Sequence, residues 1–203
     1  MDYSILFVPG LHNSGPEHWQ TWLEQNTPGA QRVVQDDWCK PDLVQWSAKI
    51  ESAIHNAEHR VILVAHSFGA LASVVAATNA GDRVAGALFV APADPTRYSV
   101  SGEILPAEAY LLDGGLYNAI PKERLMFPSI IAASLNDPCI PFKRAAWWAS
   151  VWRSKLVTLG NLGHVNEASQ LGPWPEGEAL LRDVIKNAEQ RDALWDQIIR
   201  WAF

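Results

Sequence analysis

Ser67 lies in the stretch VILVAHSFG, where a run of apolar residues leads into a serine, an aromatic residue and a glycine. The apolar run predicts a buried strand, and the segment ALASVVAATNA that follows predicts a helix. A serine at such a turn, with small residues two positions away on either side, has the pattern of a nucleophile elbow, which exposes its hydroxyl. The small residues are Ala65 and Gly69, so AHSFG departs from G-x-S-x-G by one methyl group. The alternative is an ordinary turn serine.

His164 is the predicted partner of this serine, because a serine hydroxyl needs a base to become nucleophilic and the base needs an acid to orient it. In this architecture the chain order is serine, acid, histidine. Of the six histidines, only His164, in the loop GNLGHVN, follows the last predicted strand. His66 adjoins Ser67, but neighbours across a sharp turn point apart, so we interpret it as a packing residue. A core or surface role is the alternative for His164.

Two aspartates at predicted strand ends are candidates for the acid. Asp94 lies in APADP after the fourth strand, and Asp137 lies in SLNDPCIP after the fifth. We favour Asp137, because it precedes the histidine by one strand and its prolines stiffen the loop that holds the carboxylate. Asp94 is then expected to be a turn residue that binds backbone N–H groups or Arg97.

Negative charge that grows on a substrate oxygen during attack requires an oxyanion hole. The residue after the nucleophile supplies one backbone N–H, which here is that of Phe68. The second is expected from Leu11 in the loop PGLHNSG, where Gly10 allows a sharp turn. Asn13 or Ser14 could add a side-chain donor for substrate binding, or could merely cap the helix that follows.

These residues follow short apolar runs that alternate with amphipathic segments of helix length. The alternation predicts an α/β fold in three layers, a mostly parallel sheet of about six strands with helices on both faces. Ligands bind such sheets beyond the carboxyl ends of the strands, where Ser67, Asp137 and His164 fall. The expected strands span residues 5–8, 31–35, 61–65, 86–90, 129–134 and 155–159, and the expected helices span residues 16–25, 41–58, 68–80, 141–151 and 177–203.

The length of 203 residues fits one domain over residues 1–203. The one long connection, residues 92–128, predicts a short cap over the site with small helices at AEAYLL and KERLM.

Composition excludes several classes of partner. The net charge is −6 and no Lys/Arg cluster occurs, so we expect binding neither to nucleic acid nor to an anionic membrane. No apolar stretch approaches the roughly 18 residues of a membrane span, and MDYSILFVPG reads as a strand rather than a signal peptide. Cys39 and Cys139 are therefore expected to be reduced thiols of a cytoplasmic protein. No Cys/His set has metal spacing, and the weak candidate HNSGPEH straddles a helix start, so no metal or cofactor is expected.

Four segments together carry a resemblance to a known family: PGLHNSGPEHWQTWLE, VAHSFGAL, SLNDPCIPFKRA, and GHVN followed by LGPWPEGEALL. They span almost the whole chain, which resembles the small serine hydrolases of the α/β-hydrolase superfamily, typified by retinoblastoma-binding protein nine and bacterial YdeN-type proteins. The resemblance implies a lidless or nearly lidless hydrolase with Ser67, Asp137 and His164 as its triad. It also implies activity on small carboxylic esters or amides through an acyl-enzyme, without a cofactor.

The alternative function is a protein-interaction module on a hydrolase fold, with weak or secondary catalysis. The motif L-x-C-x-E, used to bind retinoblastoma-type pocket proteins, is absent from the sequence. Binding alone would not need a serine, an aspartate and a histidine in this order, so we favour catalysis and leave a protein partner unsupported. A lipase that acts at membranes is disfavoured, because the expected cap is short.

Overall fold

A computed structural model describes residues 3–99, 102–105 and 115–202 of the chain. At its centre is a sheet of six strands in which every described pairing is parallel. From one edge to the other the order is β2-β1-β3-β4-β5-β6. The strands are β1 (Ser4–Val8), β2 (Gln31–Arg32), β3 (Val61–His66), β4 (Val84–Val90), β5 (Ser129–Ala133) and β6 (Lys155–Thr158).

The apolar run before Ser67 forms β3, whose residues are all buried. Side chains alternate along a strand, and here Leu63 and Ala65 join one hydrophobic cluster while Ile62 and Val64 join the other. Burial on both faces explains why this strand is continuously apolar rather than alternating.

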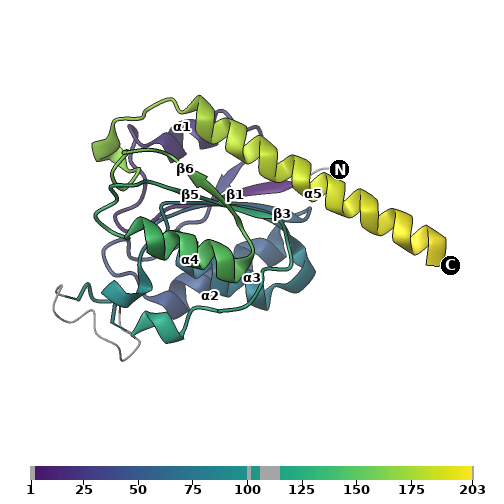
Figure 1. The fold of residues 1–203 in the computed structure, drawn as a ribbon, viewed down its shortest axis with the longest axis horizontal. Coiled ribbons are helices and arrows are strands. Elements are labelled where there is room, and N and C mark those ends of the chain that lie inside the picture. The colour runs from purple at the N-terminus through teal and green to yellow at the C-terminus, as the bar shows by residue number, and fades with distance from the viewer. Residues whose placement is uncertain (1–2, 100–101, 106–114, 203) are drawn as a thin grey trace.

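Helices cover both faces of the sheet (Figure 1). Helices α2, α3 and α4 contribute to the cluster on one face, and α1 and α5 contribute to the cluster on the other. The predicted three-layer α/β fold with a mostly parallel sheet of about six strands is therefore confirmed. The helices are α1 (Trp19–Gln25), α2 (Leu43–Asn56), α3 (Phe68–Asn79), α4 (Phe142–Trp152) and α5 (Pro175–Ala202).

The edge strand β2 is shorter than the predicted span of residues 31–35 and ends at Arg32. The N–H of Val33 still donates to the carbonyl oxygen of Phe7, at 2.9 Å, before the chain leaves the sheet. Among the described strands, β2 pairs with β1 alone, because it lies at the edge of the sheet.

Helices α1 and α5 begin at different residues from those predicted. The first begins at Trp19 because Nδ1 of His18 accepts the N–H of Gln20, at 3.1 Å, and so caps the helix there. The last begins at Pro175, and proline suits a first turn because its nitrogen needs no acceptor.

The predicted cap segment, residues 92–128, is described only in part. Its described residues form two short 3-10 turns, Pro95–Arg97 and Leu116–Asn118, which contact each other. The helix predicted at AEAYLL lies outside the described residues. That the segment caps the site stays a prediction.

The helix predicted at KERLM is wrong. Residues 122–126 are irregular, and the N–H of Leu125 donates to the carbonyl oxygen of Trp152 at 3.2 Å. Leu125 is buried against the α4 side of the sheet. A contact with a distant helix end therefore overrides the local helical preference of these residues.

The longest helix, α5, has 28 residues and spans about 42 Å. Its first half packs on the sheet through Leu181, Val184 and Ala188, which are buried. Its C-terminal end stands clear of the body of the molecule (Figure 1). In the part of the chain that the structure describes, no helix is long and apolar enough to cross a bilayer.

Candidate active site

Ser67 occupies a sharp turn between β3 and α3, with φ 54° and ψ −125°. Positive φ is strained for any residue except glycine and must be held by its surroundings. The N–H of Ser67 donates to the carbonyl oxygen of Val90 at 3.2 Å. A Cβ on Gly10 would lie 2.7 Å from Cβ of Ser67, and one on Gly69 would lie 2.6 Å from the carbonyl oxygen of Val8. The two glycines therefore allow the close approach that the turn requires.

Three side chains predicted from sequence lie in one hydrogen-bonded line. His164 Nε2 is 2.8 Å from Ser67 Oγ, and His164 Nδ1 is 3.0 and 2.9 Å from the two carboxylate oxygens of Asp137. Each residue follows the carboxyl end of a different strand: β3, β5 and β6. Parallel strands present these ends on the same edge, which is why residues almost one hundred positions apart meet. The arrangement allows Ser67 to pass its proton to the ring.

The acid loop is tied to the histidine loop through Asn136. Its Oδ1 accepts hydrogen bonds from Ser134 Oγ, at 2.9 Å, and from the N–H of Gly163, at 2.8 Å. Asp137 Oδ1 also accepts from the N–H of Cys139 at 2.7 Å. The carboxylate is therefore held in position before any substrate binds.

Asp94, the other candidate for the acid, lies in a different turn. Its Oδ1 accepts from the N–H and the hydroxyl of Thr96, at 3.0 and 2.8 Å. Its Oδ2 is 3.7 Å from Nε of Arg144. The structure thus brings Asp137, and not Asp94, to His164.

Two side chains hold the backbone of the histidine loop. His66 Nε2 donates to the carbonyl oxygen of His164 at 2.9 Å, and Trp19 Nε1 donates to that of Val165 at 2.7 Å. Val165 has φ 51°, which is a rare conformation for a β-branched residue. These bonds keep the loop in that conformation. The sequence predicted a packing role for His66, and its ring does pack against that of His164, with centroids 5.0 Å apart and the planes tilted, but the sequence did not predict its hydrogen bond.

The histidines of the site have strongly displaced pKa values. Burial lowers the pKa of His164, but interactions with Asp137 and Cys139 raise it and prevail, so it rises from 6.5 to about 9. Burial, assisted by the charge of His164, lowers the pKa of His66 well below 6.5. Burial and a nearby arginine lower the pKa of His18 to about 4. His164 is therefore the histidine of this group that is positively charged at neutral pH.

The two amides predicted for the oxyanion hole belong to Phe68, directly after Ser67, and to Leu11, directly after Gly10, which closely approaches Ser67. Phe68 is the first residue of α3, so its N–H has no intrahelical acceptor. Leu11 precedes His12 and Asn13, which have φ values of 67° and 66°. Among the described residues, no backbone acceptor binds the N–H of Leu11. Their role as oxyanion donors stays a prediction.

Asn13 and Ser14 are engaged within the protein. Asn13 Oδ1 accepts from Arg32 Nη1 at 3.1 Å, and Ser14 Oγ donates to Gln20 Oε1 at 2.7 Å. Gln20 in turn donates to the carbonyl oxygen of Val64, in β3, at 2.9 Å. Both side chains therefore brace the loop after β1, and substrate binding by them stays a prediction.

One cluster in the described part of the chain has donors that a divalent metal ion could use. Ligand atoms of Asp137, Cys139 and His164 lie within 4.8 Å of one another. Sequence spacing did not indicate it, because the histidine comes from another loop. The same aspartate and histidine atoms already bond to each other.

The chain is similar to a known protein family and to several solved structures. A family model described as serine hydrolase matches residues 5–183. The crystal structure of a YdeN-like hydrolase from Pectobacterium atrosepticum matches with a TM-score of 0.78 and 35% identity, covering 93% of this chain and 91% of that one. The ydeN product of B. subtilis matches with a TM-score of 0.69 and 17% identity, covering 91% and 100%. Est1E from Butyrivibrio proteoclasticus, solved with ferulic acid bound, matches with a TM-score of 0.68 and 13% identity, covering 92% and 89%. No curated protein matches.

Proposed function

Because this chain belongs to the serine hydrolase family, we propose that it cleaves carboxylic esters through an acyl-enzyme formed on Ser67. The observation that carries the proposal is the line of hydrogen bonds from Ser67 Oγ through His164 to Asp137, at 2.8 and 2.9 Å. This is the geometry of a nucleophile, a general base and the acid that orients it. A structure of the same fold, Est1E, carries ferulic acid, which supports carboxylic acid derivatives as the substrate class.

The proposed reaction has two halves. In the first, His164 Nε2 takes the proton of Ser67 as Oγ bonds to the carbonyl carbon, and the N–H groups of Leu11 and Phe68 stabilise the oxyanion. The C–O bond to the alcohol then breaks, and His164 returns the proton to the departing oxygen. In the second half, water attacks the acyl-enzyme with His164 as base, which releases the carboxylic acid and restores Ser67. Asp137 stabilises the charged ring in both halves, and no step requires a metal or organic cofactor.

Both cysteines are free thiols in the structure. We therefore propose a cytoplasmic location, where thiols stay reduced.

A panel of p-nitrophenyl esters with acyl chains of increasing length, beside matching p-nitroanilides, tests the activity. We expect saturable hydrolysis of the esters, much slower hydrolysis of the anilides, and labelling of one site by a fluorophosphonate. The chain-length profile identifies the acyl group that fits. Failure of the folded protein both to hydrolyse every ester and to label would refute the proposal.

The pH dependence should follow the protonation of His164. The base must be neutral to accept a proton, and the pKa of His164 is about 9. We therefore expect kcat/KM to rise with pH as a single ionisation centred near pH 9, with roughly one hundredth of the maximum at pH 7. Initial rates on one p-nitrophenyl ester from pH 6 to 10, corrected for spontaneous hydrolysis, measure it. A midpoint close to 6.5 would contradict the net rise of this pKa.

A further inference from the structure

The C-terminal end of α5 exposes an unusual amount of apolar surface. Two tryptophans and three aliphatic residues occur within eight positions of this helix. Their exposed fractions are large: Leu194 56%, Trp195 57%, Ile198 45%, Ile199 53% and Trp201 90%. The match to the family model ends at residue 183, before this end of the helix.

Part of this surface continues the face by which α5 packs on the sheet. Leu181, Val184 and Ala188 are buried on that face, and helical spacing places Trp195 and Ile199 in line with them, with Ile198 next to Trp195. The sheet ends before the helix does, so the face continues past its support (Figure 1). The exposed apolar residues of this part of α5 form a stripe, and the apolar stripe of an amphipathic helix is normally buried against another surface.

The C-terminal part of α5, residues 192–202, forms a projecting helix. A cavity of 1070 Å³, the corner, lies beside it, at the end of the sheet opposite Ser67. Trp195 and Asp192 line one side, and the starts of the central strands with Met126 line the other. Met126 is 78% exposed. The volume is near the upper end of the roughly 300–1,000 Å³ of small-molecule sites, and the cavity is open to solvent, so it has room for a protein element.

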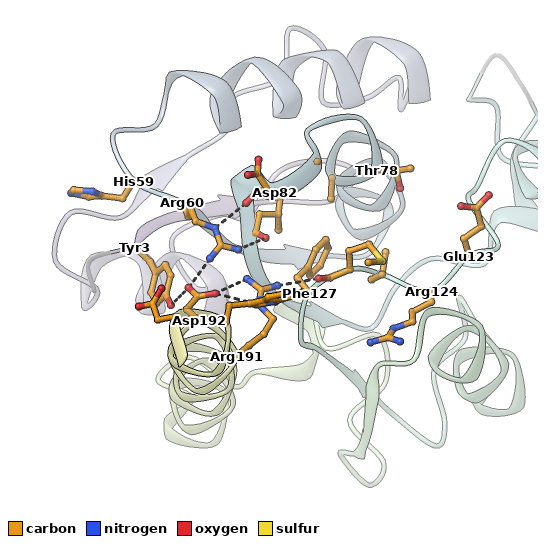
Figure 2. Close-up of a pocket in the computed structure, with 17 residues that line it drawn as sticks. Tyr3, His59, Arg60, Thr78, Asp82, Glu123, Arg124, Phe127, Arg191 and Asp192 are labelled. Carbon is orange, nitrogen blue, oxygen red and sulfur yellow. Dashed lines mark hydrogen bonds and ion pairs between the residues drawn. The ribbon is translucent and has the colours of Figure 1, made fainter. Parts of the chain in front are cut away.

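Asp192 fixes the base of the projecting helix rigidly to the body (Figure 2). Its carboxylate accepts from Arg60 Nη1 at 2.6 Å and from the hydroxyl of Tyr3 at 2.9 Å. Arg191 donates to the carbonyl oxygen of Met126 at 3.0 Å. The helix thus leaves the body at a fixed angle, and the corner is a preformed surface.

We propose that a second copy of this chain occupies the corner, in a twofold dimer in which each projecting helix packs into the corner of its partner. A twofold axis makes the two contacts identical, so one association covers both stripes and fills both corners. A contact that repeated in one direction would instead leave a stripe exposed at the end of the assembly.

The exposed area agrees with a dimer of ordinary size. The exposed parts of Trp195 and Trp201 amount to about 300 Å². The three aliphatic residues of the stripe and Met126 raise the apolar area to about 500 Å² per copy. A standard interface buries about 800 Å² per partner, of which roughly 60% is apolar. The patch therefore supplies the apolar share of such an interface.

Charges at the rim are complementary between copies. Asp196 lies beside the stripe and lines the corner, and Glu123 and Arg124 line the opposite wall. None of these three makes a hydrogen bond or ion pair with another described residue. Each is therefore available to pair with the opposite charge of a second copy at the polar rim.

Sedimentation velocity of the full chain, from about 1 to 200 μM, tests the proposal in the affinity range of interfaces of this size. We expect wild-type protein to form a species of twice 22.4 kDa. Ile198→Glu places an unpaired carboxylate in the contact and should weaken association at least about 100-fold. Met126→Glu, on the wall of the corner, should also weaken association, at least about 10-fold.

Ala193→Glu is the matched control, because it adds the same charge to the opposite side of the projecting helix, and it should change association by less than about twofold. All variants should hydrolyse ester at the wild-type rate per chain, which also shows that they fold. Wild-type protein that stays monomeric at about 200 μM would overturn the proposal. An open-ended series of larger species, or equal weakening by Ala193→Glu and Ile198→Glu, would overturn it as well.

Discussion

Replacing Ser67 by alanine is expected to lower kcat on a p-nitrophenyl ester by about 10⁶-fold, with little change in KM. The hydroxyl is the proposed nucleophile, because its oxygen lies 2.8 Å from Nε2 of His164, the proposed base. Substrate would still bind and meet the amides of Leu11 and Phe68, so some rate above that in water should remain. Labelling by a fluorophosphonate should disappear. Steady-state rates and intact-protein mass spectrometry measure both effects.

Ser73→Ala provides a control for the same chemical change. Ser73 is a buried serine on α3, and its hydroxyl has no hydrogen-bond partner within the described structure. Its removal should leave kcat within about twofold of wild type and cost no stability. If Ser67→Ala kept more than about one hundredth of the wild-type kcat, another nucleophile would have to carry the reaction.

The second large effect is expected for Asp137→Asn, which should lower kcat by about 10⁴-fold at neutral pH. An amide can donate to Nδ1 of His164 and so hold the ring with its protons in the wrong place for catalysis. The loss of the carboxylate should also move the midpoint of the pH profile below 9, because Asp137 is one of the groups that raise this pKa. The two effects should appear together in rates measured from pH 6 to 10.

Asp94→Asn is the matched control for that change. Asp94 is also buried at a strand end, but it binds Thr96 and does not reach the histidine. It should keep kcat within a few-fold of wild type and leave the pH midpoint unchanged, at the cost of some stability. A larger loss for Asp94→Asn than for Asp137→Asn would contradict the proposed acid.

Much of the fold followed from local patterns. Apolar runs alternating with amphipathic segments predicted the parallel sheet, and β3 and α3 begin where the pattern around Ser67 places them. The resemblance to small serine hydrolases and YdeN-type proteins is confirmed by the family match and by a relative with 35% identity. Because strand ends converge, the order along the chain pointed to Ser67 and His164 and left two candidate acids. Strand position and the prolines of its loop favoured Asp137 over Asp94, and the structure brings Ser67, Asp137 and His164 together.

What the sequence did not show depends on contacts between distant segments. The hydrogen bonds from His66 to the carbonyl oxygen of His164 and from Trp19 to that of Val165 join residues that are 98 and 146 positions apart. No local pattern encodes such pairs. The helix wrongly predicted at residues 122–126 failed for the same reason, because a bond from Leu125 to the end of α4 decides that conformation. The position of Cys139 beside the histidine also required the folded loops.

The hydrogen bond between His66 and the carbonyl oxygen of His164 also determines a tautomer. A carbonyl oxygen has no proton to give, so the neutral ring of His66 must carry its proton on Nε2. His18 accepts the N–H of Gln20 on Nδ1, so its neutral ring has the same tautomer. With both of their pKa values lowered, these rings stay neutral in the physiological range. The rings of His18, His66 and His164 lie side by side near Ser67. As the pH rises past neutrality, His164 is the one of the three that loses a proton, and it is the ring that the proposed reaction uses.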